Sequence, residues 1–328
     1  MAKSWKEWEK PLLEIDEALA KAKEIAKNCA AEERAAAEER IAYYEQRRDN
    51  IIKVMYSRLG AWEKVLVARA EPRPYALDYI GGICTDFVEL GGDRRIGDDH
   101  AVVGGPAMFN GRPVMILGQQ KGRNIQDRQY RNFAMAKPEG YRKAIRLMEM
   151  ANRCKMPVLS FVDTPAADPG VESESRGISE AIAASILAMF DLEVPSIAVI
   201  IGEGGSGGAI GLAAASKVLM QEHAVYSVIP PEGCAAILWR QPAEGAKAAA
   251  ALRLTAQNAL EWGLIDGIIN EPFGAAHRDW NEAMSNVKTA VQDAFLSLEG
   301  LSGDQIKAQR YEKFRKMGQF VDGLVGTN

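Results

Sequence analysis

The segment that most constrains the fold of this sequence is VIIGEGGSGGAIG, residues 199–211. An apolar run there passes directly into a glycine-rich loop, and small apolar residues follow. The run is typical of a buried strand, and the alanines beyond the glycines favour a helix. Glycine lets backbone amides approach a ligand closely, and amides at a helix N-terminus carry the positive end of the helix dipole. The segment therefore predicts a strand–loop–helix unit that faces something negatively charged.

Two kinds of anion fit such a loop. Gly202, Gly204 and Gly207 match the G-x-G-x-x-G pattern of a dinucleotide site, with Glu222 about 20 residues further on. Alternatively, the amides around Gly207 and Gly208 form an oxyanion hole that stabilises charge during a reaction. The strand hairpin predicted before this unit argues against an open doubly wound sheet, and the Lys-Ser or Lys-Thr of a P-loop is missing. The glycines are also consistent with a tight strand–helix turn and nothing more.

Composition limits the class of protein. The net charge of −4 over 328 residues argues against nucleic acid as the main partner. Because no run of about 18 apolar residues occurs and the charged start does not read as a signal peptide, we expect a cytoplasmic protein without a membrane span. We expect neither a disulfide nor a metal site, because no CxxC pair or metal-ligand spacing occurs among Cys29, Cys84, Cys154, Cys234, His100, His223 and His277.

Hydrophobic patterning divides the chain into three parts. Residues 1–70 carry apolar side chains at helical spacing, among them Leu12 and Ile15, with charged residues between them. This predicts a hairpin of two antiparallel helices that ends at Gly60. The prolines of EPRPYALDYI mark the boundary to a main domain over 71–280, and helices dominate 281–328.

The main domain alternates short apolar runs with helical patterns. Asn110-Gly111 predicts a turn between two strands, the strongest hairpin signal in the chain. Further strands are predicted at PVLSFVD, PSIAVIIGEG, KVLMQE, AVYSVI and GLIDGIIN, and helices over 138–155, 177–190, 207–216 and PEGCAAILW. The repeated strand–strand–helix order predicts an α/β fold with the chemistry in loops at the strand ends.

Several long motifs, which occur in a fixed order, resemble one known family. They are LGGDRRIGDDHAVVGG, RNFAMAKPEGYRKAIRLM, FVDTPAADPG, IGEGGSGGA, YSVIPPEGCAAILW and EPFGAAHRD. With them the whole chain, including its helical start, resembles the alpha subunits of bacterial acetyl-CoA carboxylase carboxyltransferases. The resemblance implies a crotonase-like (ClpP/crotonase) spiral of ββα units with an N-terminal helical hairpin.

The resemblance also implies an activity and partners. The family transfers a carboxyl group from N-carboxybiotin, held on a biotin carboxyl carrier protein, to acetyl-CoA, which gives malonyl-CoA for fatty acid biosynthesis. Its alpha chain works with a beta subunit that carries a zinc ribbon, in an α2β2 heterotetramer, and biotin carboxylase completes the ATP-binding complex. Zinc is therefore expected only in the partner.

Site residues follow from the same resemblance. The turn Gly207–Gly208–Ala209 corresponds to the backbone amides that stabilise charge on the ureido oxygen of biotin, a task suited to fixed dipoles. Gly204, Gly205 and Ser206 precede that turn. The loop Asp163–Gly170 is expected to border the biotin pocket with Thr164, Pro165, Ala166 and Gly170.

Three other motifs allow a structural and a functional interpretation. Glu232-Gly233 either caps the helix that follows or lines the site, and capping is the preferred interpretation. His277-Arg278 is expected to stabilise the C-terminal region, and the family motif also allows a contact with the site. A run of basic residues suits either a solvated face or attraction of CoA phosphates and an acidic carrier (Lys121, Arg123, Arg128, Arg131, Arg142, Lys143, Arg146).

The chain departs from the family pattern near the expected site. In the loop that usually reads D-T-P-G-A-Y-P-G, Ala166 replaces a glycine and Asp168 replaces an aromatic residue. Ala134 and Ala275 also stand where the family has glycine. A charge at Asp168 would repel a carboxylated cofactor in a dry pocket, and Ala166 matters if its φ is positive. These departures suggest a subunit with altered acyl-CoA preference or a scaffold that has lost the chemistry.

Overall fold

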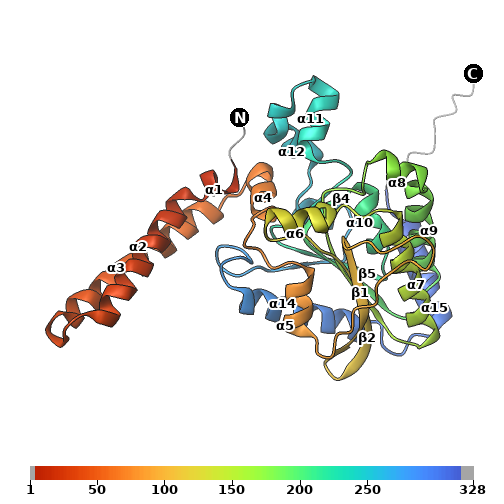
Figure 1. The fold of residues 1–328 in the computed structure, drawn as a ribbon, viewed down its shortest axis with the longest axis horizontal. Coiled ribbons are helices and arrows are strands. Elements are labelled where there is room, and N and C mark those ends of the chain that lie inside the picture. The colour runs from red at the N-terminus through yellow and green to blue at the C-terminus, as the bar shows by residue number, and fades with distance from the viewer. Residues whose placement is uncertain (1–3, 319–328) are drawn as a thin grey trace, which may run out of the picture.

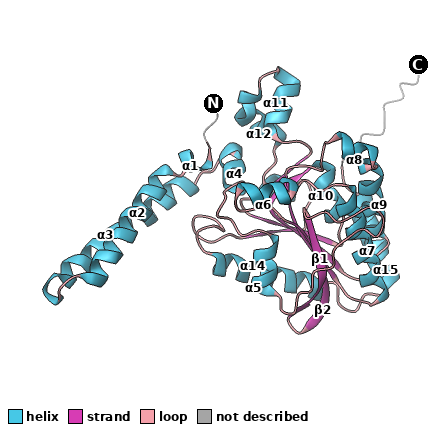
Figure 2. Cartoon of the chain, in the orientation of Figure 1, coloured by secondary structure: helices cyan, strands magenta, loops and turns pink. Residues whose placement is uncertain are grey.

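A seven-stranded sheet runs through the body of the molecule, with helices on both faces and a helical arm projecting to one side (Figure 1). The computed structural model describes residues 4–318 of the 328. Figure 2 shows the strands gathered in the body, whereas the arm is made of helices. The strands are β1 (Val102–Phe109), β2 (Arg112–Gln119), β3 (Val158–Thr164), β4 (Ser196–Gly205), β5 (Lys217–Gln221), β6 (Val225–Ser227) and β7 (Gly267–Ile269).

The strands cross the sheet in chain order, β1-β2-β3-β4-β5-β7, and β6 pairs with the end of β4. β1 and β2 are antiparallel, and Asn110 and Gly111 both take the left-handed φ that a tight hairpin turn requires. From β2 onwards the neighbouring strands are parallel, so helical crossovers connect them. The carboxyl ends of β3 and β4 therefore lie side by side.

The central strands are covered on both faces, which explains their continuous apolar sequence. Along β4, Ala198 and Ile200 face one helical layer, whereas Ile197 and Val199 face the other. The first layer contains α7 (Pro138–Arg153), α9 (Ile178–Phe190) and α10 (Ser206–Ala213), and the second contains α5 (Ala76–Ile83) and α14 (Trp280–Leu296). Successive side chains of a strand point to opposite faces of the sheet, and here both faces are covered by helices.

The projecting arm consists of α2 (Lys10–Asn28) and α3 (Arg34–Tyr56), joined through the short helix η1 (Ala31–Glu33). Leu12 and Ile15 of α2 pack against Ile52 of α3, as the helical spacing predicts. The arm begins after α1 (Trp5–Trp8) and leads into α4 (Ala61–Ala68), which packs on the body. The predicted hairpin is thus present, but its predicted end at Gly60 is wrong, because α3 ends at Tyr56 and Gly60 is the N-cap of α4.

The remaining helices lie around the sheet and its two helical layers. They are α6 (Ile125–Tyr130), η2 (Asn132–Ala134), α8 (Val171–Ser175), α11 (Pro231–Trp239), η3 (Pro242–Glu244), α12 (Gly245–Leu252), α13 (Ala256–Glu261) and α15 (Gly303–Arg315). In Figure 1, α11 and α12 stand away from the body as a separate pair. None of the helices between residues 4 and 318 is both long and apolar enough to cross a membrane. The predicted strands and helices of the main domain are confirmed, whereas the division at residues 70 and 280 stays a prediction.

A buried carboxylate fixes the arm to the body. Glu9, between α1 and α2, is fully buried and accepts hydrogen bonds from Tyr56 and Arg278. Its carboxylate also lies 2.9 Å from Nε2 of His277. Arg278 further pairs with Asp16 of the arm. The predicted role of His277-Arg278 is therefore corrected: this pair holds the N-terminal helices, which are brought to it by the fold, and not the C-terminal region.

A second buried ion pair joins the linker before α5 to the sheet. Arg73 donates two hydrogen bonds to Glu271, of 2.7 and 2.9 Å, and others to Gln221 on β5 and to the carbonyl of Ile201 on β4. Both side chains of the pair are almost fully buried. Burial alone would raise the pKa of Glu271, but the charge and hydrogen bonds of Arg73 outweigh it and lower that pKa to about 2.

This ion pair predicts a loss of stability in acid. The pKa of Glu271 is lower in the folded state than in the unfolded chain, so its contribution is complete above the unfolded value and is lost as pH falls towards 2. We expect Glu271→Gln to lower the free energy of unfolding by about 3 kcal/mol at pH 7 and by much less at pH 3. Urea unfolding at both pH values measures this, and an equal loss at both would contradict it.

Three successive non-glycine residues take left-handed backbone angles in η2. Asn132, Phe133 and Ala134 have φ values of 44°, 55° and 62°. Ala275 is also left-handed, at 77°. Such angles strain a residue that carries a Cβ atom, by about 1 kcal/mol each. Ala134 and Ala275, two of the departures from the family pattern, thus occupy positions at which glycine is favoured.

The strain at Ala134 predicts an unusual tolerance of glycine. Ala134→Gly and Ala136→Gly both remove a buried methyl group, but only the first relieves a left-handed backbone. We expect Ala136→Gly to destabilise the fold by about 1–2 kcal/mol and Ala134→Gly to change stability by less than about 0.5 kcal/mol. Thermal unfolding of the two variants is the measurement, and equal losses would show that the backbone at Ala134 is unstrained.

Candidate active site

The glycine-rich loop lies where β4 passes into α10, at the carboxyl edge of the sheet. β4 is buried along its whole length, and Ser206 begins α10 with a left-handed φ of 53°. In a helix that begins at Ser206, the amides of Ser206, Gly207 and Gly208 precede the first intrahelical hydrogen bond. The amide of Ala209 is the first that helix geometry pairs with a carbonyl, that of Gly205. Free amides at the positive end of a helix suit an anion or a developing negative charge.

Close packing explains most of the glycines. A Cβ atom on Gly205 would overlap the carbonyl group of Pro165, and one on Gly208 would lie 2.5 Å from the amide nitrogen of Ala167. A Cβ atom on Gly204 would lie 2.8 Å from a ring carbon of Tyr226. These contacts leave no room for a side chain, because two of them are with backbone that cannot move aside. The turn-and-packing explanation therefore holds for these positions, independently of any chemistry.

Gly207 differs from its neighbours. A Cβ atom there would meet only side-chain carbons of Ile182, the nearest at 3.5 Å, which is an ordinary contact. Both Gly207 and Ser206 are partly exposed and line an apolar cavity of about 430 Å³. Packing thus does not require glycine at 207, and the space beside its amide is open to a ligand.

The loop after β3 forms the other side of this turn. Thr164 pairs with Gly204 across the parallel strands, and its hydroxyl donates a 2.6 Å hydrogen bond to the carbonyl of Ala166. Gly170 ends the loop as the N-cap of α8. Ala166 is outside the set of residues with positive φ, so glycine is not required there on backbone grounds. The fold thus brings the predicted residues of the two loops, Thr164–Gly170 and Gly204–Ala209, into direct contact.

Asp168 is occupied within its own loop. Its carboxylate accepts hydrogen bonds from the side chains of Asn132, at 3.0 Å, and Ser173. Burial favours the neutral acid, but these hydrogen bonds outweigh it and lower the pKa of Asp168. Asp168, which stands where the family has an aromatic residue, therefore links the loop to η2 and α8 through hydrogen bonds.

A row of charged side chains lies beneath the two loops, where the β3–β4 register shifts between Val162 and Thr164. Nζ of Lys121 lies 2.7 Å from Asp163 and 3.0 Å from Glu203. Nε of Arg69 lies 2.7 Å from the other oxygen of Glu203, and its remaining nitrogens reach Glu232 at 2.6 and 3.3 Å. Burial would raise the pKa of Glu203, but the two cations lower it to about 2.

This row corrects one prediction and adds residues that the sequence patterns did not single out. Glu232 makes no helix cap, because α11 has no side-chain cap and the carboxylate binds Arg69 instead. Arg69 and Glu203 were not predicted as site residues. The available signal was Glu203 itself, a charge within the apolar run VIIGEGG, since a buried carboxylate needs a partner.

The predicted basic cluster is dispersed by the fold. Lys121 is used in the row just described, and the other six side chains bind separate carboxylates or carbonyl groups (Arg123 with Asp78, Arg128 with Glu71, Arg131 with Asp127, Arg142 with Asp93, Lys143 with Asp98, Arg146 with the carbonyls of Leu90 and Gly92). All of these cations except Arg146 are thus paired with a carboxylate within the described residues, so the cluster forms no shared positive patch for phosphates.

The dinucleotide alternative finds no support in the topology. A dinucleotide site lies at a point where the strand order reverses, whereas here the strands follow one another in sequence. The carboxylate of Glu222 accepts a 3.4 Å hydrogen bond from the amide of Glu271, and the amide of Glu222 donates to the carbonyl of Ile269. Both the side chain and the backbone of Glu222 are therefore hydrogen-bonded beside β7. Among residues 4–318 no group of three His, Cys, Asp or Glu side chains is arranged to hold a metal ion.

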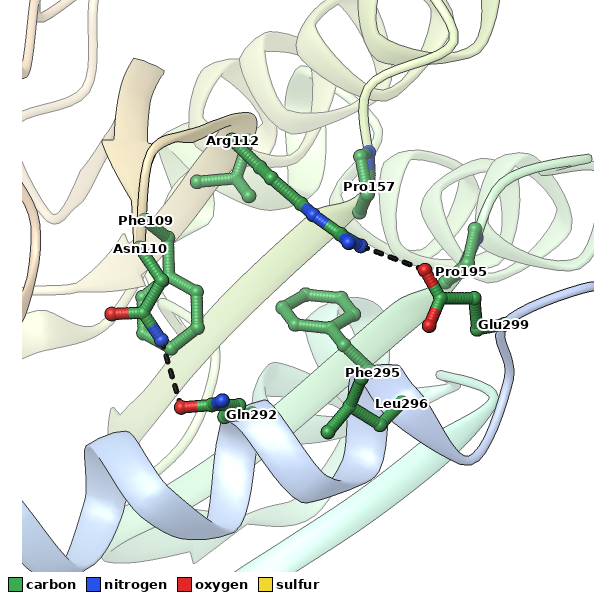
Figure 3. A pocket seen from close by; sticks show the side chains of 10 residues that line it. Phe109, Asn110, Arg112, Pro157, Pro195, Gln292, Phe295, Leu296 and Glu299 are labelled. Atoms are coloured by element: carbon green, nitrogen blue, oxygen red, sulfur yellow. Dashed lines mark hydrogen bonds and ion pairs between the residues drawn. The ribbon is translucent and has the colours of Figure 1, made fainter.

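A further cavity, of about 300 Å³, lies at the opposite ends of the strands (Figure 3). Pro157 and Pro195 precede β3 and β4 there, and Phe109 and Phe295 form apolar walls. Ligands of sheets with parallel strands bind at the carboxyl ends, which this cavity does not approach. The glycine-rich loop is therefore the candidate site.

Comparison with known proteins gives matches along almost the whole chain. A family model described as acetyl co-enzyme A carboxylase carboxyltransferase-like matches residues 5–318. The acetyl-coenzyme A carboxylase carboxyl transferase subunit alpha of Geobacter metallireducens is 48% identical over 316 residues, covering 96% of this chain and 98% of the relative. The protein of the same name from Thermus thermophilus is 47% identical, with 96% and 99% covered.

Solved structures share the fold at low sequence identity. Transcarboxylase 12S superposes with a TM-score of 0.55 at 20% identity, covering 78% of this chain and 44% of that one. A malonate decarboxylase hetero-dimer of Pseudomonas gives 0.54 at 18% identity, covering 67% and 90%. The predicted crotonase-like α/β fold is confirmed. On these similarities, the chain belongs to the family of acetyl-CoA carboxylase carboxyltransferase alpha subunits.

Proposed function

We propose that this chain is the alpha subunit of an acetyl-CoA carboxylase carboxyltransferase. It would transfer the carboxyl group of N-carboxybiotin to acetyl-CoA and give malonyl-CoA for fatty acid synthesis. The observation that carries the proposal is the identity of nearly half of all residues to curated alpha subunits along almost the whole chain. In the glycine-rich loop, the first amides of α10 precede the first intrahelical hydrogen bond and are suited to such chemistry.

The proposed role of the loop is to stabilise negative charge. N-carboxybiotin supplies the carboxyl group, and charge develops on the ureido oxygen as that group leaves. We assign the stabilising donors to the amides of Gly207 and Gly208, at the positive end of α10. Each fixed donor of this kind contributes about 2.7–4 kcal/mol to stabilisation of a transition state. Ala209 contributes through its position, since its amide belongs to the helix.

The residues present fit a biotin ring beside these amides. Gly207 carries no side chain where packing would permit one, and the adjoining cavity is apolar, with Tyr226 and Trp262 in its wall. Thr164, Pro165, Ala166 and Gly170 would border the pocket, because their loop is in backbone contact with the turn. Gly204, Gly205 and Ser206 would set the course of the chain into α10.

The proposed assembly follows the family. A beta subunit that carries a zinc ribbon would supply the pocket for acetyl-CoA, and the biotin carboxyl carrier protein would deliver biotin from biotin carboxylase. We propose an α2β2 heterotetramer in the cytoplasm. The decisive experiment is the reverse reaction, with the chain, a carboxyltransferase beta subunit, malonyl-CoA and free biocytin. Loss of malonyl-CoA that requires biocytin and both chains is expected, and no turnover by the assembled complex would contradict the proposal.

Gly207 offers the cleanest test of the oxyanion hole. A Cβ atom there would meet only side-chain carbons of Ile182, and the branched side chain of Gly207→Val would stand beside the free amides, so we expect normal folding and a fall in kcat of about 100-fold or more. Gly208→Ala is unsuitable, because its methyl group would collide with the backbone of Ala167. The measurement is biocytin-dependent turnover alongside a thermal unfolding curve.

Gly81→Ala is the matched control for this variant. Gly81 lies in α5, and a Cβ atom on it would contact nothing within 4 Å. We expect this variant to keep wild-type turnover. Wild-type turnover in Gly207→Val as well would remove the assignment of the oxyanion hole.

The alternative of an inactive scaffold makes an opposite prediction at Ala166 and Asp168. Because the carboxylate of Asp168 is bound by Asn132 and Ser173 and Ala166 is unstrained, we expect the unmodified chain to be active. Restoring the family residues with Ala166→Gly and Asp168→Tyr should then change kcat/KM by less than about threefold. A gain of 100-fold would favour the scaffold.

A further inference from the structure

The charged row beneath the loops continues beyond the site, into α11. Arg69 stands at the end of α4 and binds two carboxylates at once, that of Glu203 on β4 and that of Glu232 in the first turn of α11. Glu203 is two residues before the end of β4, from which the glycine-rich loop emerges. One guanidinium thus joins the base of that loop to a helix outside the sheet.

α11 has few other attachments to the body. It packs through Cys234 and Ala235 on Ala248 of α12, and α12 in turn packs through Ala249 on Val65 of α4. The two helices form the pair that stands apart in Figure 1. Apolar contacts therefore hold α11 to α12, whereas the ion pair of Glu232 with Arg69 joins α11 to the end of α4, and through Arg69 to Glu203 on β4.

The segment before α11 faces the two loops of the site. Pro230 and Ile229 share a cavity of only about 20 Å³ with Pro165, Gly204 and Gly205, and Arg69 and Glu203 also line it. This is space for about one water molecule. The chain around Pro230 is thus held almost against the loops by the Arg69 bridge at its side.

We propose that Arg69 is a positioning residue that sets the opening between Pro230 and Pro165, beside the glycine-rich loop. Its planar guanidinium can serve two carboxylates in fixed directions, which a lysine ammonium cannot do with the same geometry. The inference rests on the proposed function for its catalytic consequence, since the opening would control how the biotin group reaches the loop. The structural part, a tie between β4 and α11 through the guanidinium of Arg69, stands independently.

Glu232→Gln is the sharpest variant for a test. It keeps the shape of the side chain and leaves Arg69 and Lys121 bound to Glu203, so the buried carboxylate remains paired. Because Glu232 is partly exposed, we expect the thermal midpoint to fall by less than about 3 °C. Arg69→Met would instead leave a buried charge short of a partner, and we expect a large loss of stability.

Two measurements on Glu232→Gln separate positioning from stability. We expect amide hydrogen exchange in residues 231–239 of the full chain to accelerate by about three- to tenfold, with other helices unchanged. In the complex with the beta subunit we expect the KM for biocytin to rise by about three- to tenfold while kcat stays within about twofold. Arg69→Lys should also show faster exchange and a higher KM, because a lysine ammonium cannot bind both carboxylates with the geometry of the guanidinium.

Glu299→Gln is the matched control. It removes the same charge from an exposed pair with Arg112 at the opposite ends of the strands, drawn in Figure 3, and should change neither measurement. Unchanged exchange in 231–239 of Glu232→Gln would overturn the tie, and faster exchange with an unchanged KM would overturn the positioning role. A wild-type complex without carboxyl transfer would contradict the proposed function alone, because the exchange measurement would still decide the tie.

Discussion

The geometry of the site depends on a contact between two stretches of backbone. The loop after β3 lies directly on the turn after β4, where Pro165 faces Gly205 and Ala167 faces Gly208. Side chains between them would force the strand ends apart, so glycine at these positions is a packing requirement first. The same approach leaves the start of α10 open at Gly207, beside which we propose that the chemistry takes place.

Buried charges hold these two loops from below. Parallel strands bring Asp163 and Glu203 close together, and two neighbouring carboxylates in a dry place would repel each other. Lys121 lies between them and Arg69 completes the neutralisation of Glu203. Because each charge has a partner from a different part of the chain, the row joins the linker, the sheet and α11 into one unit around the loop.

The departures from the family pattern have different physical consequences. Asp168 fits because hydrogen bonds from Asn132 and Ser173 satisfy its carboxylate, and Ala166 fits because its φ is not positive. Ala134 and Ala275 instead occupy left-handed backbone that favours glycine. Ala134 and Ala275 are therefore expected to lower the stability of the fold, whereas Ala166 and Asp168 leave the backbone of the loop unstrained.

The sequence by itself determined the local elements and the identity of the family. Continuous apolar runs, the Asn110-Gly111 turn and the glycine-rich loop depend on neighbouring residues, so the strands, the hairpin and the start of α10 were predictable. The partners of charged side chains were not. Glu232 was expected to cap its helix and His277 to act near the C-terminus, yet they bind Arg69 and Glu9, which lie 163 and 268 residues away along the chain. Ion pairs of this kind form only after the sheet has brought distant segments together, and therefore only the tertiary structure decides them.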